Sequence, residues 1–295
     1  MINVLHLGLS YACNMKCKHC FVNKNLDKLN KDDFKHIIDV LYDNGLIMLY
    51  YTYGEPLLSD YFEEISSYAK QKGLVQILMT NGSVLTDKKI EIIKQNRINN
   101  VFISLDHINQ NIHDENRGFG GAHSLAIKAI KKCVQNNIKV GIATTVNQSN
   151  IDCLEDIYNF AINNNVSVMS FLRERKNCKI ALMDKEQEEK YKQFFVYCMK
   201  NTNRINVNFH DPSLLPTIKE CYKNGEIDEK TYDKFYNMSL CHYQNTLSIS
   251  PDGLVRCCNL SGKPFGDINK EDLKLIIKRM KDVNENYVCC SGVSE

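Results

Sequence analysis

The sequence predicts an α/β protein in which the first 170 residues form a parallel sheet with helical crossovers. Six apolar runs rich in β-branched and aromatic residues alternate with segments of helical periodicity. The runs cover residues 2–9, 46–51, 74–79, 100–105, 138–146 and 166–172. Because parallel strands need long crossovers, usually helices, this alternation favours a parallel sheet. Whether the sheet stays open or curls into a partial barrel does not follow from periodicity.

Two of the crossover segments show helical spacing clearly. In the first, apolar residues recur at positions i, i+3, i+4 and i+7, as Phe34, Ile37, Ile38 and Leu41. We expect Asn30 to cap the start of this helix and Gly45 to stop it. Residues 151–161 repeat the pattern before the sixth strand.

The regular alternation of predicted strands and helices ends after about residue 180. A charged and aromatic helix is predicted over 184–200, followed by a strand over 203–209. Residues 246–249 and 254–256 flank the turn Ser250-Pro251-Asp252-Gly253, which predicts a β-hairpin. An amphipathic helix follows at 273–280. We therefore expect two domains, a core over 1–180 and a small α+β extension over 181–295.

Composition excludes several classes of function. The chain has 295 residues, a net charge of +2 and 13 cysteines. Near-zero net charge argues against a nucleic-acid binder, which usually carries a basic face. No apolar run reaches the roughly 18 residues needed to cross a membrane, and residues 1–10 do not resemble a secretory signal. We expect a cytoplasmic protein, in which many cysteines are more typical of metal binding or catalysis than of disulfides.

The cysteines divide into three groups. Cys13, Cys17 and Cys20 form C-x3-C-x2-C directly after the first predicted strand. Five more lie in the last 55 residues: Cys241, Cys257, Cys258, Cys289 and Cys290. The other five are isolated: Cys133, Cys153, Cys178, Cys198 and Cys221. We expect the isolated cysteines to be small buried hydrophobic residues.

Three thiolates within eight residues can converge on one metal centre. With three protein ligands, a four-iron cluster keeps one iron open to substrate or cofactor, whereas structural zinc sites are usually closed by four ligands. The alternative is a zinc site completed by His19 or by a distant cysteine.

Four further motifs make the chain resemble the radical S-adenosylmethionine (SAM) enzymes. The resemblance covers about residues 1–175 and begins with Cys13-Asn-Met-Lys-Cys17-Lys-His-Cys20. Later strands are followed by Tyr53-Gly54-Glu55-Pro56, in which Tyr replaces the first Gly of the family motif, by Thr80-Asn81-Gly82, by Ile103-Ser104-Leu105-Asp106 and by His113-Asp114 with Arg117-Gly118. The resemblance implies a partial (β/α)6 barrel with a [4Fe-4S] cluster and SAM at the carboxyl edge of the strands.

The resemblance also assigns roles in SAM binding. Gly54 and Glu55 would hold the amino group, since a carboxylate suits an ammonium ion and glycine permits close approach. Ser104 would bond the ribose or the carboxylate, with Asp106 in the same pocket, and Arg117 would pair with the carboxylate. A plain β-to-α turn at Glu55 and an Asx-turn at Asp106 are the alternatives.

Further residues near the same pocket are assigned more loosely. His19 replaces the aromatic residue that the family usually shows, and we interpret it as packing near the adenine. Leu172, in the sixth predicted strand, is placed in the cofactor pocket. Arg173 and Arg175 share one face of an extended chain and would bind an anionic group of the substrate, although a solvated pair explains them equally well.

The C-terminal cysteines resemble the auxiliary-cluster extension of these enzymes, of the SPASM or twitch type. We assign Cys241, Cys257, Cys289 and Cys290 to a second [4Fe-4S] cluster. The family's final C-x2-C is replaced by two adjacent cysteines, so one of them ligates or the turn is unusual. A zinc-stapled tail is the alternative. Cys258 would then be a spare thiol that donates a hydrogen atom to a substrate radical; the alternative is that the spare thiol is a cysteine of the tail.

The resemblance implies one activity and leaves the substrate open. The enzyme would reductively cleave SAM to a 5′-deoxyadenosyl radical, with flavodoxin or ferredoxin as the electron donor. The radical would abstract a hydrogen atom from a peptide or peptidyl side chain, leading to oxidation, cross-linking or epimerisation. One alternative is a dehydrogenase or epimerase of a carbohydrate-like small molecule in antibiotic biosynthesis. The other is a non-catalytic iron–sulfur or zinc protein, which has no use for the Gly54, Ser104 and Arg117 set.

Overall fold

The computed structural model describes residues 1–295 except 23–24, 177–178, 181–182, 241–244, 260–262 and 283–295. Its contacts divide the chain into two compact units, each described by itself below. Unit 1 takes residues 1–16, 20–102 and the described part of 242–290. Unit 2 takes residues 17–19 and the described part of 103–241.

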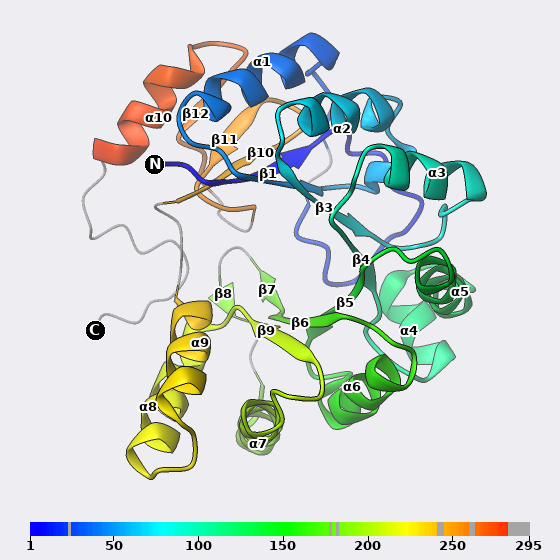
Figure 1. Ribbon diagram of the computed structural model, residues 1–295, viewed down its shortest axis with the longest axis vertical. Coiled ribbons are helices and arrows are strands. Elements are labelled where there is room, and N and C mark those ends of the chain that lie inside the picture. The colour runs from blue at the N-terminus through cyan, green and yellow to red at the C-terminus, as the bar shows by residue number, and fades with distance from the viewer. Residues whose placement is uncertain (23–24, 177–178, 181–182, 241–244, 260–262, 283–295) are drawn as a thin grey trace. The chain divides into compact units, whose positions relative to one another are not determined.

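Unit 1 is a mostly parallel sheet with helices at its side (Figure 1). Its strands follow the order β12-β11-β10-β1-β2-β3. Their bounds are β1 (Val4–Gly8), β2 (Met48–Thr52), β3 (Val75–Thr80), β10 (Thr246–Ile249), β11 (Leu254–Arg256) and β12 (Gly266–Asp267). The helices are α1 (Lys31–Tyr42), η1 (Pro56–Leu58), α2 (Phe62–Gln71), α3 (Asp87–Gln95) and α10 (Leu273–Asp282). β10 pairs with β1 in parallel, and the hairpin partners β10, β11 and β12 pair antiparallel.

Local sequence explains how α1 begins and ends. Asn30 accepts hydrogen bonds from the backbone N–H groups of Asp32 and Asp33, and the Asp33 carboxylate accepts one from Asn30 N–H, which completes a capping box. The predicted N-cap is therefore confirmed. Gly45 lies three residues beyond the helix with a φ of +96°, a conformation that glycine adopts without strain.

Unit 2 also contains parallel strands. β5 (Val140–Val146) pairs with β6 (Val168–Arg173), and β6 with β9 (Asn206–Phe209). The end of β4 (Asn100–Ser104) runs beside β5, because Leu105 N–H donates to Ala143 C=O at 3.1 Å. β7 (Arg175–Lys176) and β8 (Lys179–Ile180) form a two-stranded antiparallel pair.

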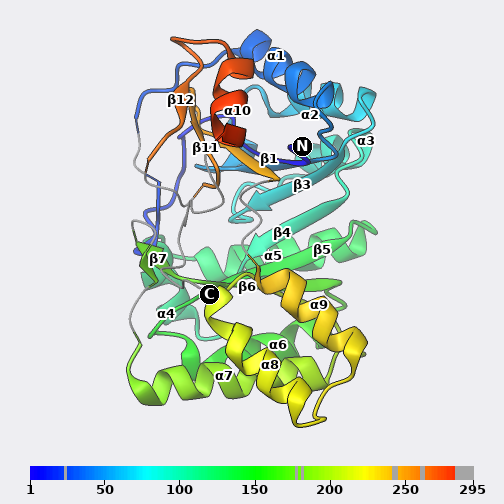
Figure 2. The ribbon, with the colours of Figure 1, turned by 90° about the vertical axis from the view of Figure 1, so that its left-hand side faces the viewer.

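In unit 2, helices follow β4, β5, β8 and β9. They are α4 (Gln110–Arg117), α5 (Ala122–Gln135), η2 (Ile151–Cys153), α6 (Leu154–Asn163), α7 (Lys185–Lys200), η3 (Pro212–Leu214), α8 (Leu215–Lys223) and α9 (Glu229–Ser239). The last two lie side by side, as Figures 1 and 2 both show. None of the helices in the described ranges is long and apolar enough to span a membrane.

The predicted α/β class is confirmed, and each of the first six strands lies within two residues of its predicted bounds. The hairpin over 246–256 is confirmed residue for residue. The predicted domain boundary at residue 180 stays a prediction. In the structure, the described part of the predicted extension contributes to both units, since β10 joins β1 in unit 1 while α7 to α9 belong to unit 2.

Candidate functional site

In unit 1, the loop that carries Cys13 is fixed against the end of β2. Gly54 follows β2 with a φ of +35°, and a Cβ built on it would lie 2.5 Å from the carbonyl oxygen of Ala12 and 2.6 Å from that of Ser10. Glu55 N–H donates to the same Ala12 oxygen at 2.7 Å. Only glycine fits so close to another backbone, so the residue after Tyr53 is dictated by this contact.

Glu55 connects the ends of β2 and β3. Its carboxylate is buried and accepts hydrogen bonds from Thr80 Oγ1 at 2.7 Å, from Asn81 N–H at 2.7 Å and from Leu57 N–H at 3.2 Å. Burial raises the pKa of Glu55, and these donors partly offset that effect. The bond to Leu57 caps η1, as a β-to-α turn would require, but the other two are long-range. The contact of Glu55 with a SAM amino group stays a prediction.

The Thr80-Asn81-Gly82 segment has a role that its motif alone does not reveal. Asn81 Nδ2 donates to Asn14 Oδ1 at 3.0 Å, and Asn14 Nδ2 donates to Ser83 Oγ at 2.8 Å. Asn14 lies between the first two cysteines of the motif. The loops after β1, β2 and β3 are thus bonded to one another at the carboxyl edge of unit 1, where parallel sheets place their active sites.

Tyr53, which replaces a glycine of the family motif, has an unusual backbone. Its φ is +60°, a region that costs a residue with a side chain roughly 1–3 kcal/mol. The side chain is buried, its hydroxyl lies 2.9 Å from Ser248 Oγ on β10, and its ring packs edge-on against Tyr11 and Phe21. The substitution therefore connects the loop after β2 to the C-terminal hairpin. The departure from the family motif was the signal for this role.

The motif cysteines differ from the isolated ones in exposure. Cys13 and Cys17 are half-buried and Cys20 is exposed, as ligands for an incoming metal centre should be. The described isolated cysteines are buried, as expected: Cys133, Cys153, Cys198 and Cys221. Burial raises the pKa of Cys133 and Cys153 to about 12, which keeps these thiols protonated and makes them poor ligands. Cys178 lies outside the described residues.

The described side chains do not form a preassembled metal centre. Within the described ranges, no group of three or more histidine, cysteine, aspartate or glutamate side chains is close enough to hold a metal ion. The number, chemistry and accessibility of Cys13, Cys17 and Cys20 fit an iron–sulfur cluster, and their assignment as its ligands stays a prediction.

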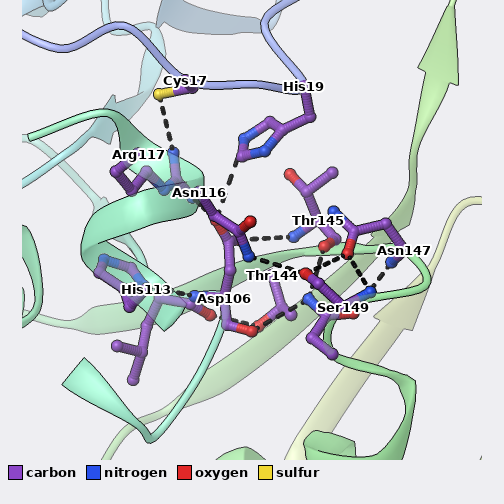
Figure 3. Close-up of polar contacts among 12 residues, drawn as sticks. Cys17, His19, Asp106, His113, Asn116, Arg117, Thr144, Thr145, Asn147 and Ser149 are labelled. Atoms are coloured by element: carbon purple, nitrogen blue, oxygen red, sulfur yellow. Dashed lines mark hydrogen bonds and ion pairs between the residues drawn. The ribbon is translucent and has the colours of Figure 1, made fainter. Parts of the chain in front are cut away.

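In unit 2, a buried network surrounds Asp106 (Figure 3). Its carboxylate lies 2.7 Å from Arg117 Nη2, accepts a hydrogen bond from Thr145 N–H at 2.9 Å and lies 3.9 Å from His19 Nε2. Its own N–H donates to His113 Nδ1 at 3.1 Å. These carboxylate contacts reach residues distant in sequence, so an Asx-turn does not account for Asp106.

Electrostatics fix the protonation states in this network. Burial acts to raise the pKa of Asp106, but Arg117, the two histidines and the Thr145 N–H outweigh it and hold the pKa below its usual value. Burial lowers the pKa of His113 to about 4 and also lowers the pKa of His19. At neutral pH the network is therefore a single buried ion pair between Asp106 and Arg117, flanked by neutral imidazoles.

The segment of residues 17–19 is bonded to the end of α4. Lys18 N–H donates to Asn116 C=O at 2.9 Å, and Lys18 Nζ lies 2.5 Å from Glu115 Oε1. Arg117 Nη1 reaches the sulfur of Cys17 at 3.9 Å. Asn116 was not among the sequence candidates, and its contribution is a backbone oxygen, which no side-chain pattern reveals.

The remaining candidates occupy the ends of strands. Ser104 ends β4 and Leu172 is the penultimate residue of β6, and both are half-buried. Their contacts with a cofactor stay predictions.

The two predicted substrate arginines have different surroundings. Arg173 is buried in an ion pair with Glu188 of α7, and its Nη1 lies 3.9 Å from Asp211 Oδ2. Arg175 is half-buried and donates to the carbonyl oxygen of His210 at 3.3 Å. Because the charge of Arg173 is already balanced, Arg175 is the better candidate for an anionic substrate group. That role stays a prediction.

Only part of the predicted auxiliary site can be placed. Cys257 is buried and Cys258 half-buried, directly after β11. Cys241, Cys289 and Cys290 lie outside the described residues, so the ligand set of a second cluster stays a prediction.

Comparison with known proteins agrees with the motifs. The family model of the radical SAM superfamily matches residues 8–161. The chain is 29% identical to Fe-coproporphyrin III synthase of Methanosarcina barkeri over 51% of this chain and 39% of that protein. It is 30% identical to the subtilosin biosynthesis protein AlbA of Bacillus subtilis over 50% of this chain and 34% of that protein. GTP 3′,8-cyclase of Clostridium perfringens is 24% identical over 94% of this chain and 89% of its own length.

Solved structures share the fold. The crystal structure of Streptococcus suis SuiB bound to the precursor peptide SuiA superposes with a TM-score of 0.75 and 16% identity, covering 94% of this chain and 64% of SuiB. At this identity the likeness is one of fold, a mixed α/β architecture like that of the radical SAM partial barrels. The chain spans only about a third to two fifths of the length of the first curated relatives that it matches.

Proposed function

This chain belongs to the radical SAM superfamily, and we propose that it uses SAM to abstract a hydrogen atom from a peptide or peptidyl side chain during peptide maturation. The observation that carries the proposal is the bonding of the cysteine loop to the loops after β2 and β3 in unit 1. Glu55 N–H on Ala12 C=O at 2.7 Å and Asn81 on Asn14 at 3.0 Å place three family motifs together. A protein that used the cysteines only as a structural staple would not need the other two loops there.

The residues of this chain fit the cofactors of the family. Cys13, Cys17 and Cys20 would hold a [4Fe-4S] cluster that leaves one iron open. The chemistry that these cofactors would supply when bound is a one-electron reductive cleavage of SAM, giving methionine and a 5′-deoxyadenosyl radical. Gly54 and Glu55 would bind the amino group of SAM, because the Glu55 carboxylate is held in place by three donors and a carboxylate suits an ammonium ion.

The remaining cofactor contacts are proposed for residues of other strands. Ser104, Asp106 and Leu172 would complete the SAM site, with His19 near the adenine. The family resemblance assigns Arg117 to the SAM carboxylate. In the structure its guanidinium lies 2.7 Å from the Asp106 carboxylate. A flavodoxin or ferredoxin would deliver the electron.

The relatives support a peptide substrate. AlbA is described as a bacteriocin biosynthesis protein, and a sporulation killing factor maturation protein, SkfB, is 29% identical over 51% of this chain. SuiB is seen with a precursor peptide bound. We therefore favour peptide maturation by oxidation, cross-linking or epimerisation. Cys258 would supply the hydrogen atom in an epimerisation, and Cys241, Cys257, Cys289 and Cys290 would hold the auxiliary cluster.

A small-molecule substrate is the second candidate. The alignment with GTP 3′,8-cyclase spans nearly the whole of both chains, whereas the peptide-maturing relatives match only about half of this one. The small molecule proposed from the sequence is a carbohydrate-like compound that is dehydrogenated or epimerised.

The test begins with the protein purified and reconstituted without oxygen. We expect about eight irons per chain and release of 5′-deoxyadenosine when SAM and dithionite are added. Cys17→Ser should abolish that release, whereas Cys221→Ser, a change at an isolated cysteine, should preserve it. Stoichiometric zinc without SAM cleavage would refute the proposal. Mass spectrometry of added peptides against GTP and sugar nucleotides then decides the substrate class.

A further inference from the structure

The guanidinium of Arg117 is shared between a carboxylate and the sulfur of a motif cysteine (Figure 3). Nη2 lies 2.7 Å from Asp106 Oδ2, and Nη1 donates to Cys17 Sγ at 3.9 Å. Counting backbone and side chain together, Arg117 is 7% exposed and Asp106 is fully buried. A planar guanidinium offers donors on two sides, so one residue can satisfy both partners at once.

Besides its ion pair with Arg117, Asp106 makes three hydrogen bonds that hold it in place. Its Oδ1 accepts from Thr145 N–H, its N–H donates to His113 Nδ1, and its C=O accepts from Asn150 Nδ2 at 3.0 Å. These three bonds come from β5, from α4 and from the segment after β5. One of these bonds holds the carboxylate and the other two hold the backbone of Asp106, so the carboxylate can orient the arginine from a fixed position.

The position of Cys17 is fixed independently. The N–H of the next residue, Lys18, donates to Asn116 C=O, the residue before Arg117. This backbone bond brings residue 17 alongside residue 117 whatever their side chains do. The N–H···S contact therefore depends on the main chain on one side and on Asp106 on the other.

Donors to the cysteine sulfurs of an iron–sulfur cluster favour its reduced state. Reduction adds one electron to the cluster, and a nearby positive charge or an N–H group pointing at a sulfur stabilises the added negative charge. Arginine stays charged at every working pH. A donor at Cys17 would therefore make the reduction potential less negative and the first electron transfer easier.

We propose that Arg117, oriented by Asp106, is a positioning residue that donates to the sulfur of Cys17 and raises the reduction potential of the cluster before SAM binds. The inference rests on the proposed function, because it requires a cluster on Cys17. It differs from the assignment of Arg117 to the SAM carboxylate, which would act only when SAM is present.

The test is a redox titration of the reconstituted protein without SAM, followed by EPR of the reduced cluster, with dithionite as the electron source. Arg117→Gln should shift the midpoint potential to a more negative value, and Arg117→Lys should give a smaller shift in the same direction. Lys18→Gln is the matched control, since it removes a neighbouring positive charge that is exposed, paired with Glu115 and screened by water. Its midpoint should stay close to that of the parent.

A double variant serves as the control for misfolding. Arg117→Gln leaves the buried Asp106 charge unbalanced, so Asp106→Asn with Arg117→Gln is made as a neutral pair. The double variant should fold and still show the more negative potential, because the donor to Cys17 is absent.

Two outcomes would overturn the inference. A parent-like potential in both Arg117→Gln and the double variant, with an intact EPR signal, shows that Arg117 does not act on the cluster. An unchanged potential with weakened SAM binding, measured by calorimetry, would show that Arg117 binds the SAM carboxylate and does not act on the cluster. If the parent itself gives no four-iron signal, the proposed function fails first, and the inference fails with it.

Discussion

Replacing Arg117 by glutamine tests whether burial makes the ion pair with Asp106 a structural requirement. The two side chains are 2.7 Å apart and only 9% and 0% exposed. Removing one member of a buried pair leaves an uncompensated charge in the interior, which costs about 3–5 kcal/mol. Typical domains are stable by only about 5–15 kcal/mol, so this loss should move the urea midpoint of the metal-free protein far below that of the parent.

The pair of Lys35 and Glu64 provides the control. Its atoms are 2.6 Å apart, nearly the same separation, but its side chains are 30% and 44% exposed. Water screens such a pair, so Lys35→Gln should unfold at nearly the parent's urea concentration. The double change of Asp106→Asn and Arg117→Gln should recover most of the loss, because no lone charge remains buried. Equal midpoints for Arg117→Gln and Lys35→Gln would refute the reasoning.

Three further predictions concern other parts of the molecule. Tyr53→Phe removes the hydroxyl bonded to the buried Ser248 and should lower the free energy of unfolding by about 1 kcal/mol; parent-like stability would contradict the role of that bond. Because the pKa of His113 is about 4 in the folded protein and 6.5 as its ordinary value, the unfolded chain binds more protons between these values, so stability should fall by up to roughly 3 kcal/mol as pH drops from 6.5 to 4. Urea unfolding of His113→Gln should show a shallower loss, and an identical pH profile would contradict the assignment. Cys258→Ala should abolish deuterium uptake from solvent into the product while 5′-deoxyadenosine release continues; persistent uptake, or none in the parent, excludes Cys258 as the hydrogen donor.

Much of the fold followed from local patterns in the sequence. The six strands, the cap at Asn30 and the Pro-Asp-Gly hairpin each depend on a few neighbouring residues, whose periodicity and turn chemistry act over short range. The pairing of β10 with β1 was not predictable in this way, because it joins segments about 240 residues apart. Side-chain alternation fixes which face of a strand is buried but not which strand becomes its neighbour.

The same distinction between local patterns and long-range contacts applies to the candidate site. The residue types at Cys13, Glu55, Asp106 and Arg117 follow from the motifs, since the chemistry of a thiolate, a carboxylate or a guanidinium belongs to the residue itself. The partners that these side chains contact do not follow from the motifs. That Arg117 meets Asp106 and Cys17, and that Arg173 meets Glu188, depends on which strand ends and helix ends the fold brings together.

By itself, the sequence determined the family, the alternation of strands and helices and the set of reactive groups, because these depend on residue identity and short-range spacing. Only the tertiary structure decided that Tyr53 adopts a positive φ and reaches Ser248, and that the Arg117 guanidinium is divided between a carboxylate and a sulfur. Both depend on burial and on contacts between segments distant in the chain. A buried polar group must find a partner, and only the packed fold determines which partner is within reach.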